Sequence, residues 1–131
     1  MVLGKTAEYF VAYFLINLGY NTSVVNHQGF DLITIIDNKP YRIEVKSSKT
    51  KIKDRNGFRF ATKQGPNGNK RNLTEDMASD IVAFVCMLKP PRIFFKPTFK
   101  ITSISHSIYS IHLNNLNLEQ DSLMQSLAEI R

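Results

Sequence analysis

The sequence predicts one α/β domain with a mixed central sheet flanked by helices, and three patterns carry this prediction. Apolar residues recur at helical spacing over Leu3–Leu18, two strand-like segments at Leu32–Ile36 and Tyr41–Val45 flank a turn, and Ile81–Met87 is apolar throughout. The 131 residues are enough for one real core and too few for two. We therefore expect one domain, with a core over residues 1–100 and a C-terminal extension over 101–131.

The expected order of elements is helix, three strands, a basic segment, a short helix, two strands and a C-terminal helix. The first helix should turn its apolar stripe toward the core and end at Gly19. Glu8 lies at the border of this stripe, from where it could reach the sheet; alternatively, a glutamate in a first turn simply complements the helix dipole. Asn21–Val25 follows as a short strand. The stripe consists of Leu3, Ala7, Phe10, Val11, Phe14, Leu15 and Leu18.

The next two strands are rich in β-branched and aromatic residues, and Asp37–Pro40 between them has the composition of a turn. If the loop holds two or four residues, we expect Asp31 opposite Lys46 and Ile33 opposite Glu44. Alternation along the strands then puts Asp31, Glu44 and Lys46 on one face. Asp31 and Glu44 would lie diagonally, roughly 7 Å apart at the backbone, within reach of one cation.

Two carboxylates beside a lysine are costly on a half-apolar strand face unless they are paired or bind a metal. Hard oxygen ligands select magnesium-like ions. A lysine near such an ion can orient or deprotonate a water, or stabilise a charged transition state. The alternative is a structural salt bridge near a strand end, which is the favoured interpretation of an isolated Glu-x-Lys tripeptide.

Three motifs in this order and spacing resemble the PD-(D/E)XK nuclease superfamily, over roughly the first hundred residues. Gly4-Lys5-Thr6-Ala7-Glu8 opens the helix, Gly29-Phe30-Asp31-Leu32-Ile33 opens the hairpin, and Glu44-Val45-Lys46-Ser47-Ser48 carries Glu-x-Lys. Phe30 stands where other members have a proline. Archaeal Holliday junction resolvases and the small homing endonucleases of introns are the two branches that look most similar.

The resemblance implies a restriction-endonuclease-like core and a metal-dependent endodeoxyribonuclease of homing or restriction type. Asp31 and Glu44 would ligate one or two Mg²⁺ ions, for which Mn²⁺ is the expected substitute, and the carbonyl of Val45 would be a further ligand. Lys46 would position the attacking water, and Glu8 would help to hold the ion or its water shell. One alternative is a Holliday junction resolvase, which needs a two-fold dimer. The others are a catalytically inactive DNA-binding module and a non-enzymatic interaction protein that uses its terminal helix.

Nine of the seventeen basic residues lie between Lys46 and Arg71, where Asp54 is the only acid. Together with a net charge of +6 and a pI near 9.6, this predicts DNA, duplex or branched, as the partner of a basic flap after the catalytic strand. A solvated polar loop is the alternative. Phe58–Thr62 could form a short strand within the flap, and its arginines are candidates for contacts to base edges. The predicted DNA-binding residues are Lys49, Lys51, Lys53, Arg55, Arg59, Lys63, Lys70 and Arg71.

After the flap, Thr74–Ser79 should form a helical turn that precedes two further strands, Ile81–Met87 and Arg92–Lys96. The first of these is apolar at every position, as in a central strand buried on both faces. Asp80 directly before it is expected to be a strand-entry or helix-end residue rather than a metal ligand.

The end of the chain is expected to hold a strand at Tyr109–Leu113 and a last helix that begins with a capping box at Asn117–Gln120. This helix has a narrow apolar stripe of Leu123, Leu127 and Ile130. Docking of the stripe on the chain's own core is favoured over pairing with a second subunit. A homodimer remains compatible with the sequence.

Several function classes have no support in the sequence. Cys86 is a lone cysteine within an apolar run, and spacings typical of cysteine or histidine metal sites are absent. No signal peptide is convincing and no stretch is long enough to span a bilayer, so we expect a cytoplasmic protein without a membrane partner. A Gly-Lys-Ser/Thr phosphate loop and a Gly-x-Ser-x-Gly elbow are also absent, so neither a nucleotide cofactor nor a serine hydrolase is expected.

Overall fold

The fold consists of a five-stranded sheet, a two-stranded sheet and flanking helices in the described part of the chain. The computed structural model describes residues 3–49, 57–61, 78–102 and 105–131. In chain order its elements are α1 (Leu3–Asn17), β1 (Asn21–His27), β2 (Phe30–Ile36), β3 (Lys39–Ser48), β4 (Gly57–Ala61), β5 (Ile81–Cys86), β6 (Arg92–Pro97), a 3-10 turn (Thr98–Lys100), β7 (Ser105–Tyr109), α2 (Ser110–Leu113) and α3 (Leu118–Ile130). The predicted α/β class and mixed sheet are confirmed. Of the predicted helical turn at 74–79, residues 74–77 lie outside the described residues, and residues 78 and 79 are not helical.

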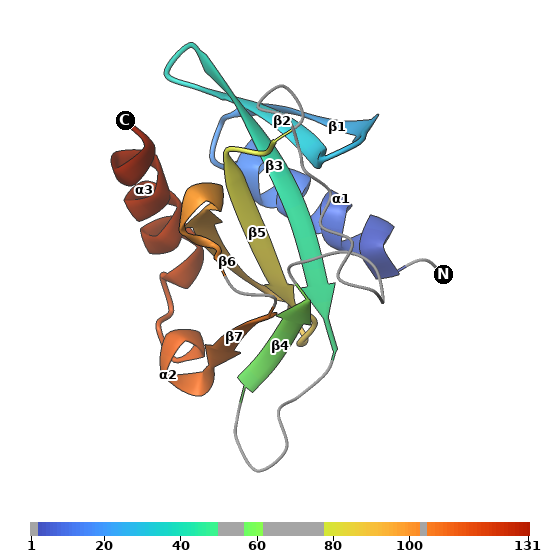
Figure 1. The fold of residues 1–131 in the computed structure, drawn as a ribbon, viewed down its shortest axis with the longest axis vertical. Helices are drawn as coiled ribbons and strands as arrows, with labels where there is room; N and C mark the ends of the chain where they lie inside the picture. Colours follow the sequence, from blue (N-terminus) through green and yellow to red (C-terminus); the bar gives the residue numbers. More distant parts are fainter. Residues whose placement is uncertain (1–2, 50–56, 62–77, 103–104) are drawn as a thin grey trace.

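The large sheet has the order β1-β2-β3-β5-β6 and is mixed, because β3 and β5 run parallel while the other neighbours are antiparallel. Both long helices pack on one face, here called the helix face, where α1 and α3 share a core with Leu32, Ile43 and Ala83. The opposite face is called the ribbon face, because the two-stranded sheet of β4 and β7, the β4–β7 ribbon, packs there on β5. In Figure 1, α1 passes behind β2 and β3, and β4 lies in front of the lower end of β3.

Helix α1 forms as predicted because its apolar side chains repeat at helical spacing. Ala7, Val11 and Leu15 are fully buried in the core of the helix face. Gly19 ends the helix with φ of +96°, a conformation that costs glycine no side-chain strain. Its N–H donates to the carbonyl of Ile16 at 2.9 Å, which satisfies one of the terminal carbonyls of the helix.

The β2–β3 hairpin differs from the expected register by two residues. Asp37 and Asn38 adopt positive φ values of 53° and 62°, as both central residues of a type I′ turn do, so the loop contains only these two residues. Ile36 therefore pairs with Lys39, and Ile33 pairs with Arg42 instead of Glu44. The expected pairing of Asp31 with Lys46 is likewise wrong. The prediction of a shared face survives, because a shift of two residues preserves the alternation.

Strand β5 is buried at all six positions and lies between β3 and β6, as predicted for a central strand. Asp80 stands at its entry and connects it to β3. Its Oδ2 accepts a hydrogen bond from the backbone N–H of Arg42 at 2.8 Å, and its own N–H donates to the Arg42 carbonyl at 2.8 Å. The interpretation of Asp80 as a strand-entry residue is confirmed.

The C-terminal region corrects two predictions. Residues Ser110–Leu113 form the short helix α2 rather than a strand, because β7 ends at Tyr109 after pairing with Gly57. Helix α3 forms, but Asn117 makes no capping side-chain hydrogen bond. Glu119, in the first turn of the helix, accepts hydrogen bonds from Arg92 Nε at 2.7 Å and from the N–H of Ile93 at 3.0 Å.

Helix α3 docks on the chain's own sheet, as predicted. Leu123 and Leu127 are buried in the core of the helix face, and Ile130 packs against it. Ser122 adds a polar contact by accepting a hydrogen bond from the N–H of Phe95 at 2.9 Å. Among the described residues, no helix is both long and apolar enough to cross a membrane.

Candidate active site

Strand β3 brings Glu44 and Lys46 together on the ribbon face. Ile43 belongs to the core on the helix face and Val45 packs against it, so the residues between and after them must project to the other side. Glu44 Oε2 lies 3.7 Å from Lys46 Nζ, and these side chains are only 18% and 17% exposed. The pair is thus partly withdrawn from water, where its electrostatic interactions are stronger than at an open surface.

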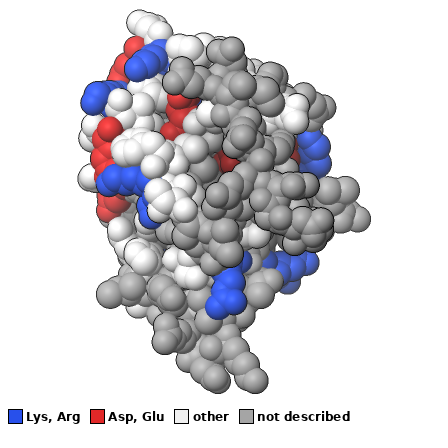
Figure 2. All heavy atoms as spheres, in the orientation of Figure 1, with Lys and Arg blue, Asp and Glu red and all other residues white. Residues whose placement is uncertain are grey.

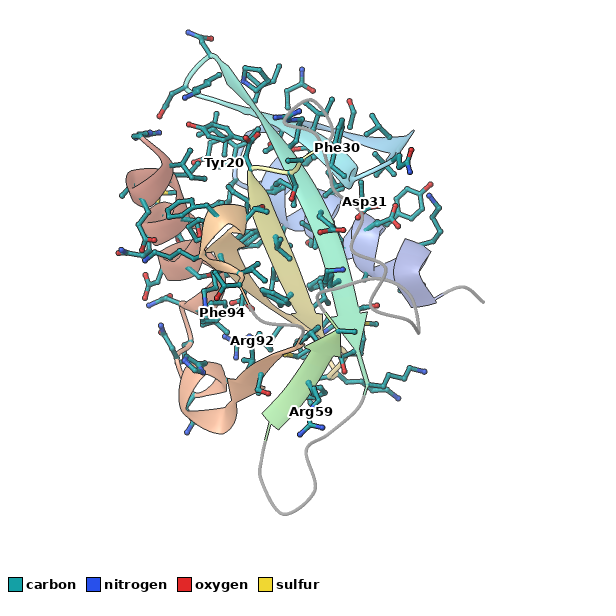
Figure 3. All side chains as sticks on the ribbon, in the orientation of Figure 1. Tyr20, Phe30, Asp31, Arg59, Arg92 and Phe94 are labelled. Atoms are coloured by element: carbon teal, nitrogen blue, oxygen red, sulfur yellow. The ribbon has the colours of Figure 1, made fainter. Side chains whose placement is uncertain are left out.

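Asp31 lies beside this pair, at the point where β2 leaves β3. The pairing of β2 with β3 extends to Leu32 and Ile43, and one further step of the same register sets Asp31 across from Glu44. The carboxylate of Asp31 accepts a hydrogen bond from the N–H of Val45, with Oδ2 at 2.7 Å from the nitrogen. A side chain thus takes the place of a strand partner on this edge of β3 (Figure 3). This contact fixes the orientation of the Asp31 carboxylate toward the Glu-x-Lys motif.

These residues fit a hard divalent cation such as Mg²⁺. Asp31 and Glu44 supply carboxylate oxygens, and Lys46 balances part of their charge. In a strand the N–H and C=O of one residue point to the same edge, so the carbonyl of Val45 is directed to the side on which Asp31 lies. Within the described ranges, no three His, Cys, Asp or Glu side chains come close enough to hold a metal ion. Mg²⁺ commonly binds through only one or two carboxylates and completes its shell with waters and substrate phosphates.

Glu8 is placed differently from the three residues on the sheet. It lies on α1, which packs on the helix face, and its carboxylate pairs with Lys5 Nζ at 3.3 Å. The first turn of α1 contains no acidic residue, so the alternative role at the helix dipole is not supported. The Glu8 side chain is only 13% exposed. Its suggested role at the metal stays a prediction.

Arg42 is a site neighbour that the sequence analysis did not single out. It lies two residues before Glu44 on the same face of β3, and its guanidinium is 5.7 Å from the centre of the Phe30 ring. Its Nε is also 3.7 Å from Asp80 Oδ2. Together with the backbone bonds to Asp80, these contacts hold the part of β3 that precedes Glu44 in place. The sequence pattern Arg-x-Glu-x-Lys could have indicated this position, because it puts Arg42 on the same face of a strand as Glu44 and Lys46.

Of the predicted DNA-binding residues, the structure describes Lys49 and Arg59, and both are exposed. Lys49 directly follows β3, and Arg59 lies in the middle of β4. The other predicted residues are outside the described ranges: Lys51, Lys53, Arg55, Lys63, Lys70 and Arg71. Figure 2 shows basic side chains in the lower third of this face. The described acidic side chains that are visible in it lie higher.

Comparison with known proteins identifies a solved structure with a similar fold. No family model matches the chain, and no curated protein matches its sequence. Among solved structures, the fold is similar to that of a bacterial homing endonuclease, I-Ssp6803I. The superposition has a TM-score of 0.59 at 12% sequence identity and covers 80% of this chain and 71% of that chain. At this low identity the likeness concerns the fold: a mixed sheet flanked by helices, as in a homing endonuclease.

Proposed function

We propose that this protein is a Mg²⁺-dependent endonuclease of homing or restriction type that hydrolyses phosphodiester bonds in DNA. One observation carries the proposal: the Asp31 carboxylate is fixed by the N–H of Val45 directly beside the paired Glu44 and Lys46. The similarity of the fold to a homing endonuclease and the net charge of +6 support it. Neither would suffice alone, because one fold can host many functions.

In this proposal the carboxylates and the lysine have different roles. A bound Mg²⁺ would supply a coordinated water of lowered pKa and would polarise the scissile phosphate. Asp31 and Glu44 would hold the ion, with the carbonyl of Val45 as a further ligand. The ammonium of Lys46, held 3.7 Å from Glu44, would orient the attacking water by hydrogen bonding and offset the negative charge that develops on the phosphate.

Cleavage of three matched substrates tests the proposal. A supercoiled plasmid, a linear duplex and a four-way junction are incubated with the protein, in Mg²⁺ or in EDTA. We expect Mg²⁺-dependent cuts at discrete duplex sequences, and no cuts in EDTA. Paired symmetric cuts confined to the junction would instead identify a resolvase, and binding of all three substrates without cleavage in any divalent ion would identify a DNA-binding module.

Variants of one strand separate catalysis from binding. Lys46→Ala should lower the cleavage rate by about 10²–10⁴-fold, the usual contribution of a positioned acid–base group, and Glu44→Ala should abolish cleavage because a ligand of the ion is lost, while folding and DNA affinity change little in both. Lys39→Ala is the matched control, because Lys39 is an exposed lysine at the other end of β3. If Lys46→Ala loses DNA affinity as strongly as cleavage, the assigned roles are wrong.

A further inference from the structure

On the outer surface of the β4–β7 ribbon, Arg59 is a long basic side chain beside the small side chains of Ala61 and Ser107. Phe58 and Phe60 point down onto the large sheet and are buried, so Arg59 and Ala61 between and after them face outward. The register pairs Arg59 with Ser107 of β7. Arg59 is exposed, and within the described part of the chain no acidic side chain forms a salt bridge with it.

This outer surface lies on the same side of the molecule as the candidate active site. Lys46 of β3 is the register partner of Phe84 in β5, so both side chains rise from the ribbon face as neighbours. The ring of Phe84 in turn contacts the ring of Phe60 edge-on, with centroids 5.0 Å apart. Phe60 is the residue next to Arg59. Packed sheets lie about 10 Å apart, which corresponds to about three base-pair steps along a duplex.

The chemistry of this surface suits a DNA groove. A two-stranded ribbon is narrow enough to enter the major groove, and the small side chains of Ala61 and Ser107 allow its backbone to approach closely. The guanidinium of Arg59 extends away from β3 (Figure 3), and arginine forms a bidentate pair with O6 and N7 of guanine. Basic side chains are visible in the lower third of the face in Figure 2, toward the end of the molecule where β4 lies in Figure 1, and positive charge there would complement a polyanion.

We infer that the β4–β7 ribbon reads the target sequence from the major groove, with Arg59 as a specificity-determining residue that recognises a guanine within about one helical turn of the cut, roughly ten base pairs. This inference rests on the proposed endonuclease function. It separates the chemistry, carried by β3, from the recognition of sequence, carried by the ribbon.

The test is a binding selection from a library of randomised DNA duplexes. The full-length chain with Lys46→Ala is used, so that bound duplexes stay intact, and the same selection is repeated with Arg59→Lys added. Lysine keeps the positive charge but lacks the planar fork of arginine. The matched control is Lys39→Gln, which removes an exposed cation at the far end of β3. Thermal melts verify that each variant folds.

The expected result is a loss confined to one base pair. Arg59→Lys should reduce the preference for one guanine by roughly ten- to a hundredfold, and should leave the remaining base preferences and the salt dependence of binding unchanged. Lys39→Gln should leave that guanine preference intact.

Two results would overturn the inference. A uniform loss of affinity for all duplexes in an Arg59→Ala protein, with the salt slope reduced by about one, would assign Arg59 to a phosphate. An unchanged guanine preference in Arg59→Lys would show that the ribbon does not read the sequence through Arg59, even if the unsubstituted chain cuts the selected duplexes in Mg²⁺. If that chain does not cut them but the Arg59-dependent preference is present, the proposed endonuclease function fails and the recognition surface stands.

Discussion

Replacing Asp31 by asparagine should separate metal binding from fold stability. The amide keeps the shape of the side chain, and its oxygen can still accept the hydrogen bond from Val45, so the change removes little more than a charge. Converting a charge-assisted hydrogen bond into a neutral one costs about 1 kcal/mol. Two like unit charges about 6 Å apart repel by about 3 kcal/mol at an effective dielectric constant of 20, so removing the Asp31 charge beside Glu44 relieves at most a repulsion of this order, and Lys46 reduces the gain. Without metal, the variant should be as stable as the parent protein or more stable by up to about 2 kcal/mol.

In the presence of Mg²⁺, the unsubstituted protein should instead be more stable than Asp31→Asn. An ion that binds only the folded state adds about 2.7 kcal/mol at a concentration one hundred times its Kd, which for a chain of this length raises Tm by about 10 °C. We therefore expect circular dichroism melts of the unsubstituted protein to move upward as Mg²⁺ is titrated, and those of Asp31→Asn to stay near their position in EDTA. The readout does not depend on DNA or on cleavage.

Asp37→Asn is the matched control for this experiment. Asp37 is an acid of the same hairpin, but its side chain is 77% exposed and pairs with Arg131 at 2.9 Å, far along the strands from Asp31. Asparagine is also well tolerated at its positive φ. The control should keep the full upward shift of Tm in Mg²⁺. An equal shift in Asp31→Asn, or no shift in the unsubstituted protein, would refute the assignment of Asp31 as a metal ligand.

Three further predictions concern stability and reactivity. Glu119→Gln should lower the free energy of unfolding by about 1.5–3 kcal/mol, because Arg92 and the N–H of Ile93 lose a charged acceptor; chemical denaturation measures this change. Burial alone would raise the pKa of Glu119, but the hydrogen bonds from Arg92 and Ile93 lower it below its usual value. Its stabilising contribution should therefore be present above about pH 4.3 and be lost as pH falls through the lower folded pKa, and stability measured against pH should be flatter in Glu119→Gln. Gly19→Ala should cost about 1 kcal/mol through backbone strain alone, because a Cβ there has no atom within 4 Å to meet; thermal melts should show a lower Tm, and an unchanged Tm would argue against the positive φ. Burial raises the pKa of the Cys86 thiol to about 12, so a thiol reagent should label it at pH 8 only after unfolding, and rapid labelling of the native protein would contradict its burial.

The elements that could be predicted are those whose signal lies in the segment itself. The helical spacing of Ala7, Val11 and Leu15 and the apolar run of β5 both report burial directly, and the structure buries them as predicted. The shared face of Glu44 and Lys46 follows from a two-residue spacing on a strand, and it holds regardless of register.

The predictions that were wrong concern segments whose local sequence is compatible with more than one structure. Asp37–Pro40 contains four residues that favour turns, but Asp37 and Asn38 accept positive φ, so the turn needs only two and Pro40 returns to the strand opposite Ile35. Asn117–Gln120 fits a capping box by sequence, yet Asn117 makes no capping side-chain hydrogen bond, and Glu119 in the same turn binds an arginine 27 positions away. The hydrogen bond from Val45 to Asp31 depends on where β2 diverges from β3, which no local pattern encodes.

The direct pairing of β3 with β5 has a consequence for how the proposed endonuclease could acquire new DNA targets. These strands run parallel and are hydrogen-bonded to each other from Ile43 and Ile81 to Ser48 and Cys86, and the Asp80 contacts tie the start of β5 to Arg42 of β3. The chain between residues 49 and 80 is therefore a detour that leaves this strand pair at one end and rejoins it at the other. Lengthening such a detour is inexpensive, because each doubling of a flexible loop costs only about 0.6 kcal/mol. Insertions outside β4, whose Phe58 and Phe60 are buried against β5, could therefore be tried by evolution, or in the laboratory, while the scaffold that holds Glu44 and Lys46 stays the same.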